Sequence, residues 1–268
     1  MNTPDCEGKL RIRVIGVCYY LRLKEFERRV DSFIANLGWG ISVDRVFLSI
    51  RHDQVADIKP WIMPRGNLLD ISAYATGADI TTSFDLYIFL NDTLFLRHPW
   101  KTLALRFASL RCALASAPKP SAVGEVHTST DLLMLDTENP TRAHLSTFCF
   151  MLNRSAFMIL GEIVQTLPNG NSTDSMMNWL NGFTLNNSAI KNLLYVHLTA
   201  RATPWSWKGL TKLPPQDLIL RKKVTVLFEY LLTTRILQSG GFVMPVNYGV
   251  LYRIRAKLSA FIARLITQ

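Results

Sequence analysis

The stretch "DLYIFLNDTLFLRHPW" (residues 85–100) decides the fold class, because a long apolar run ends directly in two polar residues. Residues 86–90 are all apolar, and Asn91 and Asp92 follow without a linker. A strand that is apolar on both sides belongs in the middle of a sheet covered by helices. Open α/β sheets bind ligands at the carboxyl ends of their strands. The stretch therefore predicts either a ligand-facing Asp92 at this edge or an Asp92 that caps the following turn.

Apolar runs on both sides of this stretch alternate between strand-like and helical spacing. The predicted strands cover residues 10–21, 42–50, the apolar run that ends at residue 90, and 144–153. The predicted helices cover residues 24–38, 67–77, a segment that begins at about residue 100, 154–167, 189–201 and 222–241. Strands that alternate with helices indicate an α/β fold with a mostly parallel central sheet flanked by helices, followed by C-terminal helices. No repeat or linker divides the chain, so we expect one domain over residues 1–250.

The composition is that of a basic globular protein. The chain has 268 residues, 49% of them hydrophobic and 19% charged, with 30 Lys+Arg against 20 Asp+Glu. This balance favours anionic partners: nucleotide phosphates, acidic lipid headgroups or nucleic acid. The basic residues are dispersed and no nucleic-acid-binding motif is present, so we predict no nucleic acid partner. A nucleic-acid binder remains the rival that salt-dependent retention on DNA would favour.

Several other classes lack their signatures. The sequence contains no G-x-S-x-G, P-loop or G-x-G-x-x-G motif, and its four cysteines are widely spaced without a CxxC pair. The first residues are polar, and no stretch approaches the roughly 18–20 apolar residues that span a bilayer. We therefore expect a protein in a reducing cytoplasm, soluble or peripheral on the inner face of the cell membrane.

The last segment, "LYRIRAKLSAFIARLITQ" (251–268), predicts a basic amphipathic helix. Six apolar residues fall on one helical face, whereas the four basic residues lie elsewhere, and no acidic residue follows Glu229. Such a helix either lies on an anionic membrane surface or docks on the core of its own domain. The sequence leaves both alternatives open.

Four stretches, in this order, carry a resemblance to a known family: "RGNLLDISAYATG" (65–77), "FLNDTLFLRHPW" (89–100), "HLSTFCFMLNRSAF" (144–157) and "FEYLLTTRILQSGG" (228–241). Together they resemble the rhamnan-synthesis-F-like glycosyltransferases and related polysaccharide transferases of the GT-A fold. The resemblance implies a bacterial glycosyltransferase that moves a sugar from a nucleotide-sugar donor to a surface polysaccharide or lipid-linked glycan acceptor.

The chain departs from the family pattern at two places. Ser72 stands where the family has Gly, and the Asp-x-Asp metal signature common in GT-A enzymes is absent, because Asn91 and Asp92 are followed by Thr93 and Leu94. The alternative function is therefore a non-catalytic, membrane-associated subunit of polysaccharide assembly that has kept a transferase fold.

On this reading two acids carry the chemistry. Glu229 lies in an otherwise apolar helix, and a carboxylate withdrawn from water suits a general base that works near neutrality. The alternative is a structural ion pair of Glu229 with Lys222 or Lys223. Asp92 would act beside it, binding sugar or ribose hydroxyls or a divalent cation, Mg²⁺ or Mn²⁺, that bridges the donor phosphates.

The resemblance also implies a donor-binding group of Arg65, Asn67, Asp70 and Asn91. Arg65 would clamp phosphate, whereas Asp70 and Asn91 would read sugar or ribose hydroxyls. The ordinary alternative is that Asn67 is the N-cap of the following helix and Asp70 its N3 residue.

Three further residues adjoin the motifs and are predicted to contact the acceptor or a phosphate: His98, His144 and Glu125. We expect "VGEVHTSTD" (123–131) to form an acceptor-side loop in which Glu125 is the second candidate base. A histidine beside an apolar strand is often structural, so that alternative stays open for both histidines.

Overall fold

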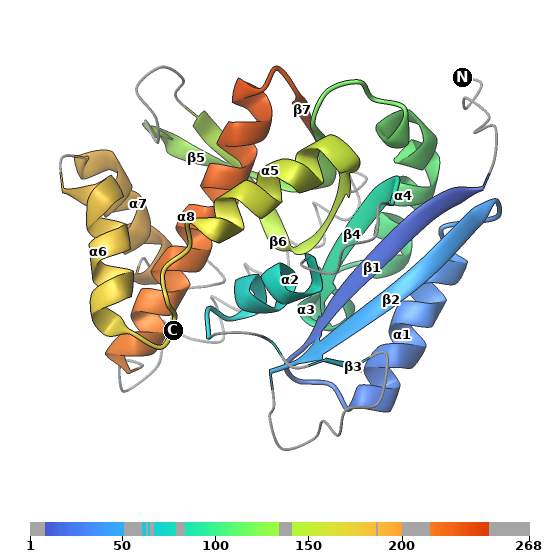
Figure 1. The fold of residues 1–268 in the computed structure, drawn as a ribbon, viewed down its shortest axis with the longest axis horizontal. Coiled ribbons are helices and arrows are strands. Elements are labelled where there is room, and N and C mark those ends of the chain that lie inside the picture. Colours follow the sequence, from blue (N-terminus) through green and yellow to red (C-terminus); the bar gives the residue numbers. More distant parts are fainter. Residues whose placement is uncertain are drawn as a thin grey trace, which may run out of the picture.

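A computed structural model describes residues 9–50, 61–62, 64, 67–78, 84–133, 141–185, 187–199 and 215–246 (Figure 1). The strands are β1 (Leu10–Cys18), β2 (Ile41–Ser49), β3 (Trp61–Ile62), β4 (Leu86–Asn91), β5 (Ser121–Leu133), β6 (Thr141–Asn153) and β7 (Phe242–Pro245). The helices are α1 (Leu23–Ala35), α2 (Asp70–Ala78), α3 (Thr93–Arg97), α4 (Trp100–Ala115), α5 (Arg154–Gln165), α6 (Thr173–Thr184), α7 (Ser188–Thr199) and α8 (Gln216–Gln238).

The seven strands form one mixed sheet in the order β3-β2-β1-β4-β6-β5-β7. β1 is parallel to β2 and β4, β2 is parallel to β3 and β5 is parallel to β7, whereas β6 runs antiparallel to both of its neighbours. The predicted α/β class with a mostly parallel sheet is therefore confirmed. The chain adds β2 and β3 on one side of β1 and then returns to place β4 on the other side. The strand order therefore reverses between β1 and β4, and we call this position the reversal point of the sheet. Rossmann-like sheets bind ligands at such a position.

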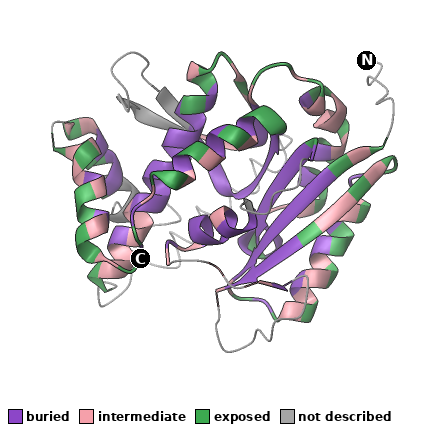
Figure 2. Cartoon of the chain, in the orientation of Figure 1, coloured by how far each residue is buried: buried purple, intermediate pink, exposed green. Residues whose placement is uncertain are grey.

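Both faces of the sheet are covered, as the apolar central run requires. Ile12 and Val14 pack in the core under α1 and α4, whereas Ile15 and Val17 point into the core under α2, α5 and α8. This alternation follows from the two-residue period of a strand. Figure 2 shows that burial is concentrated on the central strands and on α8.

Helix α8 is enclosed on all sides over much of its length. Every residue from 224 to 234 is buried, because α8 lies between β6 on one side and α5, α6 and α7 on the other (Figure 1). A helix that is apolar around its whole circumference is buried in this way. Glu229 lies in the middle of the enclosed part, as expected from its apolar neighbours.

Helix α2 lies unusually close to the sheet. A Cβ atom at Gly77 would lie 2.5 Å from Cγ2 of Ile15 on β1, so only glycine permits this approach. The contact brings the helix, and Asp70 at its first position, against the strands that form the reversal point of the sheet.

The structure also differs from the sequence-based expectations. Residues 121–133 form the strand β5 rather than an acceptor-side loop, and the short elements β3, α3 and β7 and the helix α6 were not predicted. The predicted segment 251–268 lies outside the described residues. Among the described residues, none of the helices combines the length and the apolar character that crossing a membrane requires.

Candidate functional site

The antiparallel strand β6 extends past the end of β4, at the edge where the parallel strands end. Leu90 of β4 pairs with Cys149, and because the two strands run in opposite directions, the earlier residues of β6 continue beyond β4. Val126 and His127 of β5 pair there with Leu145 and His144. Residues 144–147 therefore lie beyond the last β4–β6 pair, on the side of the sheet's edge that Asn91 and Asp92 occupy.

An irregularity in the β5–β6 pairing frees the backbone of Thr147. Gly124 pairs with Phe150 and Val126 with Leu145, so four residues of β6 lie opposite Glu125 alone. Side chains replace the missing strand partner. The N–H of Thr147 donates to Oε1 of Glu229 (3.0 Å), and its carbonyl oxygen accepts from the hydroxyl of Tyr74 (2.6 Å).

Asp92 fixes the segment after β1 to the end of β4. The residue is fully buried, and its Oδ2 atom accepts hydrogen bonds from the backbone N–H groups of Tyr19 (2.9 Å), Tyr20 (2.5 Å) and Leu21 (3.0 Å). Its side chain makes no capping hydrogen bond to α3, so the alternative of a turn cap is wrong. Its Oδ1 atom is buried and has no hydrogen-bond partner among the described residues.

Asn91 makes the local contact that was considered for Asp92. Its Oδ1 atom accepts a hydrogen bond from the N–H of Thr93 (3.1 Å), which begins α3. Its Nδ2 atom donates to Oδ2 of Asp70 (3.3 Å). The side chain therefore links the end of β4 to the first residue of α2.

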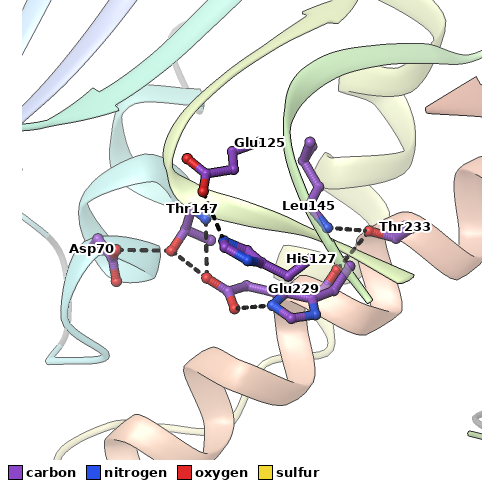
Figure 3. A network of polar contacts seen from close by, with 8 residues as sticks. Asp70, Glu125, His127, Leu145, Thr147, Glu229 and Thr233 are labelled. Atoms are coloured by element: carbon purple, nitrogen blue, oxygen red, sulfur yellow. Dashed lines mark hydrogen bonds and ion pairs between the residues drawn. The ribbon is translucent and has the colours of Figure 1, made fainter. Parts of the chain in front are cut away.

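The hydroxyl of Thr147 lies between two buried carboxyl groups (Figure 3). Its Oγ1 atom is 2.7 Å from Oε1 of Glu229 and 3.1 Å from Oδ2 of Asp70. Glu229 comes from α8, Asp70 from α2 and Thr147 from β6, so three distant parts of the sequence meet at one hydroxyl. The other oxygen of Glu229, Oε2, lies 3.7 Å from Nε2 of His144, beyond hydrogen-bond distance.

Burial sets the electrostatics around Asp70. Desolvation raises the pKa of Asp70, Lys222 opposes that rise, and the nearby Glu229 adds to it. The pKa of Tyr74 is raised well above its ordinary value, first by burial and then by Asp70, Glu229 and Asp92 among other groups. Asp92 and Glu229 thus both raise the pKa of the same phenol.

A row of imidazoles and a carboxylate leads from Glu229 toward the surface. The ring of His144 lies 5.3 Å from that of His127, whose Nε2 is 3.4 Å from Oε1 of Glu125. Oε2 of Glu125 is 3.4 Å from Nδ1 of His98. The side chain of His127 is 42% exposed and that of His144 only 5%, so the row runs from solvent into the core.

His144 is neutral at physiological pH. Desolvation, helped by His127 and Lys222, lowers its pKa from 6.5 to about 3. A neutral imidazole next to Glu229 adds no positive charge, so the ordinary ion-pair attraction is absent there.

Most of the predicted site residues are brought together at this edge. Asp70, Asn91 and Glu229 are linked at its buried centre, directly or through Thr147, whereas Asp92, next to Asn91 in the chain, bonds to residues 19–21. The three residues predicted to contact acceptor or phosphate belong to the row beside it: His98, Glu125 and His144. Asn67 precedes α2, and its backbone contacts Gly170. Arg65 lies outside the described residues.

The local alternative for Asn67 is wrong. Helix α2 begins at Asp70 itself rather than three residues before it, and the hydroxyl of Ser72 accepts from the N–H of Leu68 (2.6 Å). Lys222 lowers the pKa of both Asp70 and His144. Among the described residues, Glu229 contacts Thr147 and His144 rather than a lysine.

Thr147 is the central residue that the sequence-based reasoning did not assign. It lies within the motif "HLSTF", and an unassigned hydroxyl inside a family-like motif was the available signal.

Asp92 is not arranged as part of a ready-made cation site. Its Oδ2 atom is already surrounded by N–H donors, which would repel a cation, and only the buried Oδ1 remains. In the described part of the chain no cluster of three or more His, Cys, Asp or Glu side chains has metal-binding geometry. Oδ1 is therefore the oxygen of Asp92 that a divalent cation would use, and this cation stays a prediction from the resemblance through which we derive no step.

Comparisons with known proteins add no assignment: no family model, no curated protein and no solved structure matches this chain. The family resemblance therefore depends on the four motifs alone.

Proposed function

We propose that the protein is a glycosyltransferase of GT-A-like fold that moves a sugar from a nucleotide-sugar donor to a surface polysaccharide or lipid-linked glycan. The observation that carries the proposal is the chain of contacts from Asn91 to Asp70 and, through Thr147, to Glu229 at the end of β4, one of the two strands that form the reversal point of the sheet. Open α/β sheets bind nucleotides at this position, and carboxylate and amide groups are suited to sugar hydroxyls.

Glu229 is the general base in this proposal. Thr147 occupies Oε1 with two hydrogen bonds, whereas Oε2 is not hydrogen-bonded to His144, its neighbour at 3.7 Å. Oε2 of Glu229 would therefore accept the proton of the acceptor hydroxyl. The oxygen of this hydroxyl attacks the anomeric carbon of the donor sugar, and the nucleoside diphosphate leaves. An oriented carboxylate contributes about 10²–10⁴-fold to such a step.

Asp92 takes a positioning role in the proposal. Its three backbone contacts hold residues 19–21 at the reversal point, next to the place where a nucleotide would bind. A direct part in catalysis or cation binding, and the parts of Arg65 and Asn67 in donor binding, remain predictions from the resemblance.

A basic surface next to the site supports an anionic membrane partner. Arg29 of α1 donates to the carbonyl oxygen of Phe95 in α3 (3.0 Å), so the segments 20–29 and 92–101 are neighbours. Their exposed apolar side chains are Tyr20 (63%) and Leu96 (48%). Their exposed basic residues are Arg22, Lys24, Arg28, Arg97 and Lys101. Apolar side chains among basic ones suit an anionic lipid surface, where a lipid-linked acceptor resides.

The alternative function, a non-catalytic subunit, has one observation in its favour. Asp92 is fully buried and Glu229 is 7% exposed, and both have protein partners. Acids that are satisfied in this way also fit a purely structural role.

The decisive experiment measures donor binding and sugar transfer together. Melting temperature is recorded with UDP-, GDP- and dTDP-sugars, with and without Mn²⁺, for the wild type, Glu229→Gln and Glu162→Gln, a control on the exposed side of α5. We expect one donor class to raise the melting temperature of all three proteins, and Glu229→Gln alone to lose transfer by about 10²-fold or more. Donor binding without sugar transfer in the wild type would favour the non-catalytic subunit. If no donor raises the melting temperature, both the binding of a nucleotide sugar and the glycosyltransferase activity are refuted.

A further inference from the structure

We infer that Asp70 is a positioning residue that carries a proton at neutral pH and, through Thr147, holds Glu229 as the ionised acid of the site. The shared proton follows from hydrogen-bond geometry and is independent of the reaction. Only its consequence for sugar transfer rests on the proposed function.

The first step counts hydrogens. A hydroxyl has a single hydrogen, and an ionised carboxylate can only accept. Oγ1 of Thr147 nevertheless lies within hydrogen-bond distance of both Glu229 and Asp70. If both acids were ionised, one of the two contacts would join two lone pairs inside the protein, where an unsatisfied polar contact is costly. One of the two acids must therefore supply a second hydrogen.

The second step decides which acid supplies it. Oε1 of Glu229 accepts the backbone N–H of Thr147 at 3.0 Å, a donor that cannot reverse. Its contact with Oγ1 is 2.7 Å long, against 3.1 Å for the contact of Asp70 with Oγ1, so Glu229 has the shorter hydrogen bond from the hydroxyl as well as the backbone donor, and hydrogen bonds to a carboxylate favour its ionised form. Glu229 is therefore the acceptor and Asp70 the donor.

The surroundings of Asp70 agree with this direction. The groups that face it are Asn91 from β4, Thr147 from β6, Lys222 and Glu229 from α8, Tyr19 after β1, and Tyr74 on α2. Lys222 is the cation among them, and its effect on the pKa of Asp70 is smaller than that of burial, so the pKa stays raised.

The resulting arrangement satisfies each atom in turn. Oδ2 of Asp70 carries the hydrogen, donates it to Oγ1 of Thr147 and accepts from Nδ2 of Asn91, and the hydrogen of Thr147 is donated to Oε1 of Glu229. The site then carries one negative charge at this hydroxyl instead of two. A smaller negative charge makes the edge more compatible with a diphosphate.

Infrared spectroscopy and an isosteric substitution test the assignment without any substrate. We expect the wild type at pH 7 to show the carbonyl stretch of a protonated carboxyl group that disappears in Asp70→Asn. The amide of asparagine donates to Thr147 as the neutral acid does, so Asp70→Asn should keep the melting temperature within a few degrees, whereas Asp70→Ala should lower it clearly. A band that survives Asp70→Asn but disappears in Glu229→Gln would overturn the assignment, as would the absence of any such band.

Carbon-13 labelling of aspartate gives the same answer in the unmutated protein, should Asp70→Asn fail to fold. One aspartate carboxyl signal is expected at the protonated position at pH 7, and none there would refute the inference. In the transfer assay Asp70→Asn, which keeps a donor to Thr147, should retain more activity than Asp70→Ala, which removes it. If the spectroscopic result holds and no transfer is found in any protein, the proposed function fails and the shared proton stands.

Discussion

Oγ1 of Thr147 lies 2.7 Å from Oε1 of Glu229, and this contact joins a strand in the middle of the sheet to a helix some eighty residues later in the chain. The same glutamate oxygen also accepts the backbone N–H of Thr147. Two hydrogen bonds from one residue fix both the position and the rotation of the carboxylate. The α8 helix is thereby held in register with β6 at the edge where the parallel strands end.

Thr147→Val is expected to destabilise the protein by roughly 2–3 kcal/mol, because it leaves the buried acids Asp70 and Glu229 without their shared hydroxyl. Thr147→Ser keeps the hydroxyl and loses one methyl group, so it should cost only about 1 kcal/mol. Urea unfolding of the two variants measures the difference. A loss in Thr147→Val no larger than the loss in Thr147→Ser would show that the hydrogen bonds of the hydroxyl contribute no more to stability than the packing of the methyl group.

Asp92→Asn should destabilise the fold by roughly 2–3 kcal/mol, since the charged acceptor of three backbone N–H groups is replaced by a neutral amide. The matched control is Asp31→Asn, which removes an exposed pair with Arg45 and should change stability by less than about 1 kcal/mol. Chemical denaturation compares them. Unaltered stability of Asp92→Asn would contradict the positioning role of this residue and restore a ligand-binding one.

The central strands and most helices could be predicted from the sequence because their signal is local. The apolar run 86–90 became β4, and the helical spacing before Gly38 became α1. Glu229 was predicted to be partly buried from its apolar neighbours alone, and it is. In each case burial on a known face determines the pattern of the residues.

The antiparallel pairing of β5 and β6 was missed because the residues of β5 are unusually polar. Glu125 and His127 belong to the site, so this part of the strand lacks the apolar alternation by which strands are recognised. The β-branched residues Val123, Val126 and Thr128, followed by a short connection to the strand at 144–153, were the signal of a hairpin. Without that hairpin the overhang of β6 and the position of Thr147 could not be derived.

Lowering the pH should reduce the stability of the folded protein, because His144 is buried in its neutral form. Its pKa is about 3 in the folded protein against 6.5 in the unfolded chain, so the unfolded chain binds the additional proton as pH falls. The stabilising effect of a neutral His144 is complete above pH 6.5 and is lost progressively between 6.5 and 3. Between pH 7 and pH 5 this amounts to about 2 kcal/mol.

The variant His144→Gln isolates this contribution. Asp70, whose pKa is raised, has the opposite sign, because stability falls as pH rises through the interval between its unfolded and folded pKa values, but Asp70 is present in both proteins. The wild type should therefore lose about 2 kcal/mol more than His144→Gln between pH 7 and pH 5, as measured by urea unfolding. Parallel pH profiles for the two proteins would mean that His144 is not held neutral.

Binding to anionic vesicles should depend on the basic surface beside the site rather than on net charge. The double variant Arg97→Glu with Lys101→Glu reverses two exposed charges there, and Arg154→Glu with Lys191→Glu makes the same change of charge on the exposed sides of α5 and α7. Each basic residue near an anionic surface contributes about 1 kcal/mol, so the first variant should lose at least about tenfold in affinity. Sedimentation with phosphatidylcholine vesicles that contain or lack phosphatidylglycerol measures it. Equal losses in both variants would show that overall charge, and not this surface, attracts the membrane, because only a localised contact distinguishes residues on different faces of the same molecule.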